Sequence, residues 1–221
     1  MPVLFAWDLA GTLLQGTEHD FIEQCDTACA SLGLKRGWGL RELLPVYGLP
    51  LGEVLRKLWP RWSDRTRANF LETFLEQQPR APLRHTKPTE HAHFVLQTIR
   101  NAGGLNLIVT NTREGHALDT FIRIGGFAPF VDEVSGITPR QEHTANGNGH
   151  KAAAAKAFAQ KRGCERVVFV GDHAEDIAAG KAIGAITVLF KSGAGHADAG
   201  ADHVIGDLRK VLQLLPAGPG A

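Results

Sequence analysis

The sequence of 221 residues is poor in cysteine and has no long apolar run. Its three cysteines, Cys25, Cys29 and Cys164, are too few and too poorly matched for a disulfide framework. No further Cys or His stands at zinc-finger spacing, so we interpret Cys25 and Cys29 as small apolar side chains on a helix. The apolar run at residues 3–7 is too short for a signal peptide, and no later run approaches the roughly 20 residues of a membrane span.

The sequence also lacks any block of like charge. Its 24 Lys and Arg nearly balance its 23 Asp and Glu, which gives a formal charge of +1. Neither nucleic acid nor a membrane surface is therefore expected as the main partner. We expect a soluble, cytoplasmic protein that acts on a small molecule, and the sequence predicts no particular oligomeric state. The length suits one domain with an insertion.

Two patterns of secondary structure divide the chain. Between residues 18 and 79, apolar residues recur at helical spacing with no convincing strand, and further helices are expected at 40–47, 51–59 and 63–78. From residue 88 onward, helices and strands alternate, which is typical of a mainly parallel sheet. The fold class is therefore α/β, with a Rossmann-like core (residues 1–15 and 85–221) and an inserted helical cap (residues 16–84). The predicted elements of the second part are helices at 89–101, 114–124, 150–161, 175–183 and 208–215, and strands at 105–109, 131–134, 166–170, 185–190 and 203–205; loops are expected at 141–149 and 193–200, and a frayed tail after residue 216.

Three of the predicted strands run into polar clusters. These are residues 8–12, Thr110 with Asn111, and residues 171–176. Such a residue often only caps the following helix. Ligands of open parallel sheets, however, bind at the carboxyl ends of the strands, where all three clusters would meet. Together with Lys151, which precedes the third strand, they favour a functional site over three unrelated caps.

These motifs resemble, in order, the four signatures of the haloacid dehalogenase-like superfamily. They are DLAGTL at 8–13, LIVTN at 107–111, Lys151, and VFVGDHAED at 168–176. The helical insertion after the first signature is similar to the C1 cap of phosphoglycolate phosphatase-like members, in which GLPL at 48–51 resembles a common cap segment. The resemblance implies a Mg²⁺-dependent hydrolase of small phosphorylated metabolites that forms an aspartyl-phosphate intermediate.

The resemblance also assigns roles to particular residues. Asp8 becomes the nucleophile and a metal ligand, and Asp172, Asp176 and the backbone carbonyl of Ala10 complete the Mg²⁺ site. A cation is needed there because anions otherwise repel each other during attack on phosphorus. Lys151 would neutralise the phosphoryl oxygens, although it is alternatively a solvated lysine that opens an Ala-rich helix. The phosphate-binding residues would be Gly11, Thr12, Thr110 and Asn111.

Ala10 is the main departure from the family pattern. Phosphatases of the family carry a second aspartate here, which protonates the leaving group and then activates water. Losing positioned proton transfer costs about 10²–10⁴-fold in rate, so weak turnover is expected. Glu18 or His19, which enter the cap, are alternative proton donors.

Two other functions remain open on the sequence. Phosphonoacetaldehyde hydrolases resemble this chain at Ala10 and use a cap lysine that forms a Schiff base. The expected position is Leu51, and Lys57 lies nearly two turns further on. The second alternative is a catalytically impaired protein that binds a phospholigand. The remaining histidines suggest no metal site, because His85, His91 and His93 flank a proline-containing segment, while His173 either contacts substrate or caps a helix.

Overall fold

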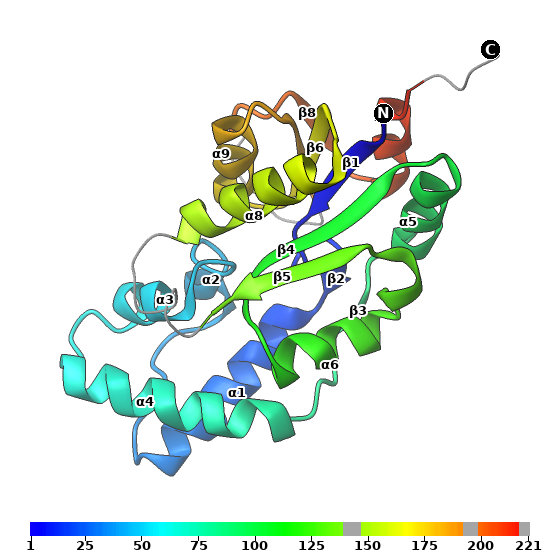
Figure 1. Cartoon of the computed structure of the whole chain (residues 1–221). Coiled ribbons are helices and arrows are strands. Elements are labelled where there is room, and N and C mark those ends of the chain that lie inside the picture. The colour runs from blue at the N-terminus through cyan, green and yellow to red at the C-terminus, as the bar shows by residue number, and fades with distance from the viewer. Residues whose placement is uncertain (139–146, 192–198, 217–221) are drawn as a thin grey trace.

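A computed structural model describes residues 1–138, 147–191 and 199–216. Its centre is a six-stranded parallel sheet with strand order β5-β4-β1-β6-β7-β8 (Figure 1). The predicted α/β fold class is therefore confirmed. The strands are β1 (Val3–Trp7), β4 (Leu105–Arg113), β5 (Glu133–Ile137), β6 (Arg166–Gly171), β7 (Ile186–Phe190) and β8 (His203–Ile205).

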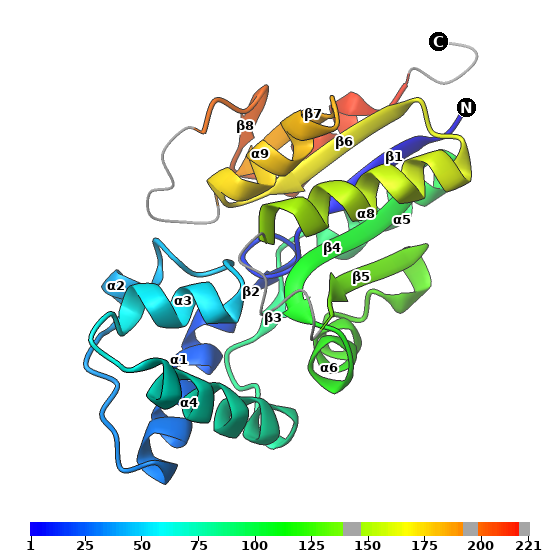
Figure 2. The same ribbon diagram turned by 60° about the vertical axis from the view of Figure 1, so that its left-hand side comes forward.

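The central strand β1 is buried on both faces. Phe5 and Trp7 pack in one apolar cluster with helices α5 (Ala92–Asn101) and α6 (His116–Gly125). Leu4 and Ala6 pack in a second cluster with α8 (Gly147–Arg162) and α9 (Ala174–Ala182), which lie on the opposite face in Figure 2. Since side chains alternate along a strand, a continuous apolar run is what a strand covered on both faces requires.

The remaining helices form a separate unit, here called the helical cap. It comprises α1 (Thr17–Ser31), α2 (Leu40–Leu43), α3 (Leu51–Leu58) and α4 (Asp64–Gln77), and it lies beyond the carboxyl ends of the strands (Figures 1 and 2). Its own core contains Cys25, Cys29, Trp59, Phe70 and Phe74. Burial raises the pKa of the Cys29 thiol to about 11 and that of Cys25 well above its ordinary value, as expected for structural cysteines.

The two chain segments that join cap and core are fixed to each other. Strands β2 (Leu14–Gln15) and β3 (Lys87–Pro88) form an antiparallel pair that the sequence analysis missed, because two residues are too short for a periodic signal. Next to this pair, the carboxylate of Asp20 accepts hydrogen bonds of 2.5–2.8 Å from the backbone N–H groups of Arg84 and Thr86 and from the Thr86 hydroxyl. Asp20 thus holds the first cap helix against the returning chain.

Replacing Asp20 with alanine is expected to lower the free energy of unfolding by about 2–4 kcal/mol. The carboxylate is buried, and its loss leaves several backbone donors without an acceptor. Asp26→Ala on the same helix is the matched control, because Asp26 forms only an exposed ion pair with Arg36, which is worth no more than about 1 kcal/mol. Urea denaturation measures both values, and equal losses would show that Asp20 has no special role in joining cap and core.

The element boundaries differ from prediction in several places. The helix expected at 40–47 ends at Leu43, because Pro45 has no N–H to donate to the preceding turn. The strand predicted at 105–109 is longer, since β4 continues to Arg113 through a shift of register. β5 begins two residues later than predicted, at Glu133. Segment 208–215 is a 3₁₀-helix (Leu208–Leu214) rather than an α-helix, and its buried residues recur three apart as that helix requires.

The predicted loops and tail are only partly covered by the structure. The loop expected at 141–149 is shorter, because α8 already begins at Gly147. Residues 141–146, 193–198 and 217–221, which carry the rest of the loop and tail predictions, lie outside the described residues. Among the residues that are described, no helix combines the length and apolarity needed to cross a bilayer.

Candidate active site

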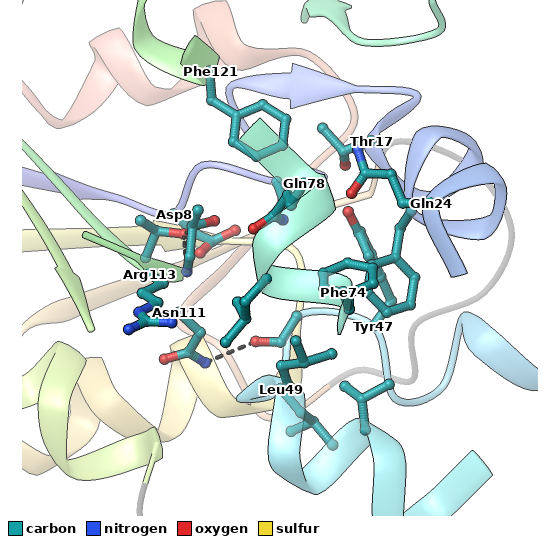
Figure 3. A pocket seen from close by; sticks show the side chains of 18 residues that line it. Asp8, Thr17, Gln24, Tyr47, Leu49, Phe74, Gln78, Asn111, Arg113 and Phe121 are labelled. Atoms are coloured by element: carbon teal, nitrogen blue, oxygen red, sulfur yellow. Dashed lines mark hydrogen bonds between the residues drawn. The ribbon is translucent and has the colours of Figure 1, made fainter. Parts of the chain in front are cut away.

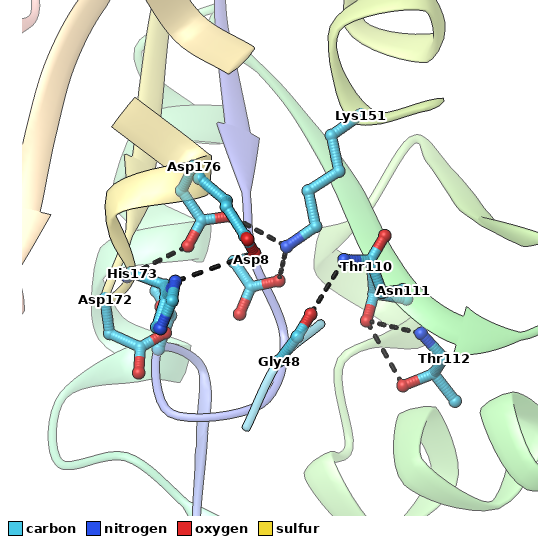
Figure 4. A network of polar contacts seen from close by, with 11 residues as sticks. Asp8, Gly48, Thr110, Asn111, Thr112, Lys151, Asp172, His173 and Asp176 are labelled. Atoms are coloured by element: carbon cyan, nitrogen blue, oxygen red, sulfur yellow. Dashed lines mark hydrogen bonds and ion pairs between the residues drawn. The ribbon is translucent and has the colours of Figure 1, made fainter. Parts of the chain in front are cut away.

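The polar clusters predicted from the sequence meet at the carboxyl edge of the sheet. Asp8 directly follows β1, Thr110 and Asn111 lie near the end of β4, and Asp172 and Asp176 follow β6 (Figure 4). Because β1 pairs with both β4 and β6, the three clusters are neighbours although more than 150 residues separate the first from the last. The shared edge that motivated the prediction is therefore present.

Lys151 is buried between two of these carboxylates. Its Nζ donates to Asp8 Oδ1 at 2.5 Å and to Asp176 Oδ1 at 2.7 Å, and the residue is only 3% exposed (Figure 4). The alternative of a solvated lysine is therefore wrong. Burial lowers the pKa of Lys151, but the charges of Asp176 and Asp8 outweigh this effect and hold it above its ordinary value. Lys151 is a fixed cation beside Asp8.

Asp8, Asp172 and Asp176 place carboxylate oxygens within 4.8 Å of one another. Burial and the nearby Asp176 raise the pKa of Asp8 from 3.8 to about 7, although Lys151 acts in the opposite direction. Burial, followed by the charge of Asp8, raises the pKa of Asp172 well above its ordinary value. Three carboxylates thus face a single lysine, and a further cation would relieve their repulsion.

Two glycines make this crowding of carboxylates sterically possible. Gly11 has a φ of 88°, and a Cβ atom there would lie 2.1 Å from Asp172 Oδ2. A Cβ atom on Gly171 would lie 2.2 Å from the Cβ atom of Asp176. Any larger residue at either position would push a carboxylate out of the cluster. The oxygen donors that remain are those that Mg²⁺ prefers, so the residues fit the metal that the sequence predicts.

The predicted phosphate-binding residues are all at or beside the site, in different environments. The Thr12 hydroxyl donates to Asp172 Oδ1 at 3.2 Å, so this side chain supports an acidic residue in the structure. The Thr110 hydroxyl contacts Thr112 at 3.2 Å. Asn111 Nδ2 donates to the backbone carbonyl of Gly48 in the cap at 2.7 Å (Figure 4). Asn111 therefore joins the core to the cap directly above the site.

A cavity of about 100 Å³ lies between Asp8 and the cap. Asp8, Ala10, Thr110 and Asn111 line its core side, and Figure 3 shows Tyr47 and Phe74 across from Asp8. Tyr47, Gln24 and Gln78 also line the cavity, although no motif of the sequence points to them. No local motif could have identified them, because their place depends on how the cap helices pack over the sheet.

Glu18 and His19, the alternative proton donors suggested by the sequence, do not line the cavity. Glu18 and His19 lie 3.7 Å apart at the start of α1, and neither is among the residues that line the cavity. Thr17 lines it instead, close to Tyr47. Burial raises the pKa of the Tyr47 phenol, which therefore keeps its proton at neutral pH. Ala10 faces this cavity with a methyl group, as the sequence predicted.

The other residues that the sequence suggested for a site are Lys57 and several histidines. Lys57 is exposed and does not line the cavity, whereas Leu51 does. His85 pairs with Glu23 at 3.1 Å, and His93 contacts the backbone carbonyl of Gly125 at 2.6 Å. His173 occupies the N-cap position of α9, where its backbone N–H donates to Asp176 Oδ2 at 3.1 Å.

Comparison with known proteins gives one family and many similar folds. The family model described as haloacid dehalogenase-like hydrolase matches residues 5–190. A haloacid dehalogenase-like family hydrolase from Streptococcus pneumoniae has a TM-score of 0.80 at 15% identity, over 97% of this chain and 99% of that one. A protein from Haemophilus somnus that is named a predicted phosphoglycolate phosphatase has a TM-score of 0.80 at 16% identity, over 96% of this chain and 97% of that one. Protein tyrosine kinase A from Mycobacterium tuberculosis has a TM-score of 0.74 at 21% identity, over 98% of this chain and 99% of that one. No curated protein matches the sequence.

Proposed function

The chain belongs to the haloacid dehalogenase-like hydrolase family, and from this premise we propose that it hydrolyses small phosphomonoesters through an aspartyl-phosphate on Asp8 in a Mg²⁺-dependent reaction. The observation that carries the proposal is the buried cluster in which Lys151 bridges Asp8 and Asp176. A structural ion pair needs only one carboxylate for its lysine. This cluster contains three carboxylates, and one of them, Asp8, lines a cavity. Such an excess of charge is typical of a functional site.

The residues support the following sequence of events. A carboxylate oxygen of Asp8 attacks the phosphorus atom, the bond to the leaving-group oxygen breaks, and the phosphoryl group becomes an acyl phosphate on Asp8. Lys151 favours the charged form of Asp8 and offers a positive charge to the phosphoryl oxygens. Thr110 and Asn111 line the same side of the cavity and would bind these oxygens. Water then attacks the acyl phosphate, which releases phosphate and restores Asp8.

Asp8, Asp172 and Asp176, with the backbone carbonyl of Ala10, are the residues that would hold Mg²⁺. When bound, the ion would offset the repulsion between the carboxylates and the phosphoryl group. Proton transfer is the step that this site serves least well. Ala10 provides no proton for the leaving group and no base for the water, so both chemical steps are expected to be slow.

Mg²⁺ is expected to stabilise the fold. At a concentration about 100 times its dissociation constant, it should raise the free energy of unfolding by about 2.7 kcal/mol. This corresponds to a rise in Tm of roughly 5–10 °C for a chain of this size. Asp172→Asn should abolish most of the shift, because it removes one of the three crowded carboxylates. Asp64→Asn, which makes the same change at an exposed cap residue, should keep the full shift.

Differential scanning fluorimetry, with and without chelator, measures these shifts. Equal shifts in the two variants would place Mg²⁺ elsewhere and contradict the proposed metal site. Of the two rival functions, the phosphonoacetaldehyde hydrolase-like one has the weaker support, because Lys57 is exposed and lies off the cavity wall. A protein that binds a phospholigand without turning it over would show the Mg²⁺ shift but no phosphate release.

A further inference from the structure

The cavity wall opposite Asp8 is largely apolar and carries no formal charge among the described residues. Of the described residues that line the cavity, only Asp8 and Arg113 are charged. Arg113 lies on β4 with Thr110 and Asn111, so its charge belongs to the core side (Figure 3). The hydrophobic part of the wall comes mainly from the cap, with one residue from α6: Phe21, Tyr47, Leu49, Leu51, Val54, Phe74, Leu75 and Phe121.

The aromatic part of this wall is packed in advance of any ligand. The ring of Phe21 lies 5.6 Å from that of Tyr47 and 5.5 Å from that of Phe74, between ring centroids. Such contacts hold the rings in place, so a ligand need not order them. The polar groups that complete the wall, including Gln24 and Gln78, are uncharged. They can orient a hydroxyl or carbonyl group, but they cannot neutralise a carboxylate.

From this distribution we infer that the cavity selects phosphate esters whose leaving group is small, uncharged and mainly apolar. The inference rests on the proposed function and names its substrate class. A carboxylate buried against this wall would lose its hydration and gain no cation there, because the Arg113 charge lies on the core side of the cavity. The volume of about 100 Å³ is also below the roughly 300–1,000 Å³ of pockets that hold drug-sized ligands, which favours a small leaving group. An acidic ester such as phosphoglycolate should therefore be a poor ligand.

A pair of non-hydrolysable phosphonates of nearly the same shape tests the inference. In (2-methylpropyl)phosphonate two methyl groups occupy the positions of the two carboxylate oxygens of phosphonoacetate. Binding to the wild-type protein with Mg²⁺ is measured by calorimetry. We expect the methyl-bearing compound to bind at least about tenfold more tightly, because only it suits an uncharged wall. Equal binding, tighter binding of phosphonoacetate, or binding of neither compound would overturn the inference.

A single substitution should shift the preference. Gln78 follows α4 as its C-cap, where a cation is also compatible with the helix dipole, so Gln78→Lys is expected to fold. The new charge should improve phosphonoacetate binding about tenfold and leave the methyl-bearing compound little changed. Gln160→Lys is the matched control, because Gln160 is exposed near the end of α8, away from the cavity. Equal effects of both variants would show that the added charge acts at long range and would contradict a role of the wall.

This test is separate from the test of turnover. If the apolar phosphonate is preferred while Asp8→Asn leaves phosphate release unchanged, the substrate class stands and the proposed nucleophile fails. If Asp8-dependent turnover is found but acidic esters are the better ligands, the proposed function stands and the inference about the wall fails.

Discussion

Replacing Ala10 with aspartate is expected to raise the rate of phosphomonoester hydrolysis by about 10²–10⁴-fold. Ala10 lines the cavity beside Asp8, so a carboxylate at this position faces the space where the ester oxygen must leave. The new carboxylic acid would protonate that oxygen, and the resulting carboxylate would accept a proton from the attacking water. The proposed nucleophile Asp8, Lys151 and the acidic cluster are already in place, so the substitution adds proton transfer alone.

The increase in hydrolysis rate caused by Ala10→Asp should depend on the leaving group of the ester. Alkyl esters release a strongly basic alkoxide and need the proton most, whereas nitrophenyl esters release a stable phenolate and need it little. Steady-state kinetics with one ester of each kind measure the difference. Ala10→Asn is the matched control, since it adds nearly the same volume but transfers no proton in this way. No gain in a folded Ala10→Asp variant that retains its Mg²⁺ shift would mean that proton transfer does not limit the native reaction.

Asp8→Asn is expected to reduce turnover by at least about 10³-fold, to the level of the uncatalysed reaction in the assay. The amide keeps the shape of the side chain but cannot attack phosphorus as a carboxylate does. Lys151 still has Asp176 as a partner at 2.7 Å, so the variant should remain folded. Asp64→Asn makes the same change at a carboxylate that is 99% exposed and should retain full activity.

Covalent trapping gives a second measurement of the same role. With a nitrophenyl ester, whose leaving group needs little protonation, the acyl phosphate on Asp8 should form faster than it is hydrolysed, because Ala10 cannot activate water. It should then persist long enough to be detected by mass spectrometry after a rapid acid quench. The adduct should map to the peptide that contains Asp8 and should be absent from Asp8→Asn. Equal turnover in the native protein and Asp8→Asn would exclude Asp8 as the nucleophile.

The sequence was sufficient to predict the polar clusters that consist of nearly consecutive residues. Asp8, Ala10 and Gly11 follow a continuous apolar strand, and Asp172 and Asp176 follow another. A buried parallel strand and the turn after it are local features, so their apolar run and glycines predict both the strand and the polar cluster at its end. The absence of an acid at position 10 was equally plain, because a methyl group cannot exchange a proton in any fold.

The sequence predicted that the cap is helical, but not which of its residues contact the core. Helical spacing of apolar residues predicts helices that share a core, and Cys25 and Phe70 are indeed buried together. The spacing does not say which residues of those helices face the sheet. The uncharged wall, with Tyr47 and Gln78 in it, therefore became visible only when the cap lay over the core.

The tertiary structure also decided what the sequence left open about Lys151. Its Nζ reaches a carboxylate 143 residues away, and both partners are buried, so the solvated alternative is excluded. The same packing joins Asn111 to Gly48 across 63 residues and thereby sets the cap above the site. The sequence by itself determined which residues are the candidate nucleophile and the acidic cluster, and that position 10 carries no acid, because these are fixed by strand, turn and residue type. Only the packing of distant segments decided the charge state around Asp8 and the chemistry of the opposite wall, because both depend on which side chains are brought together away from water.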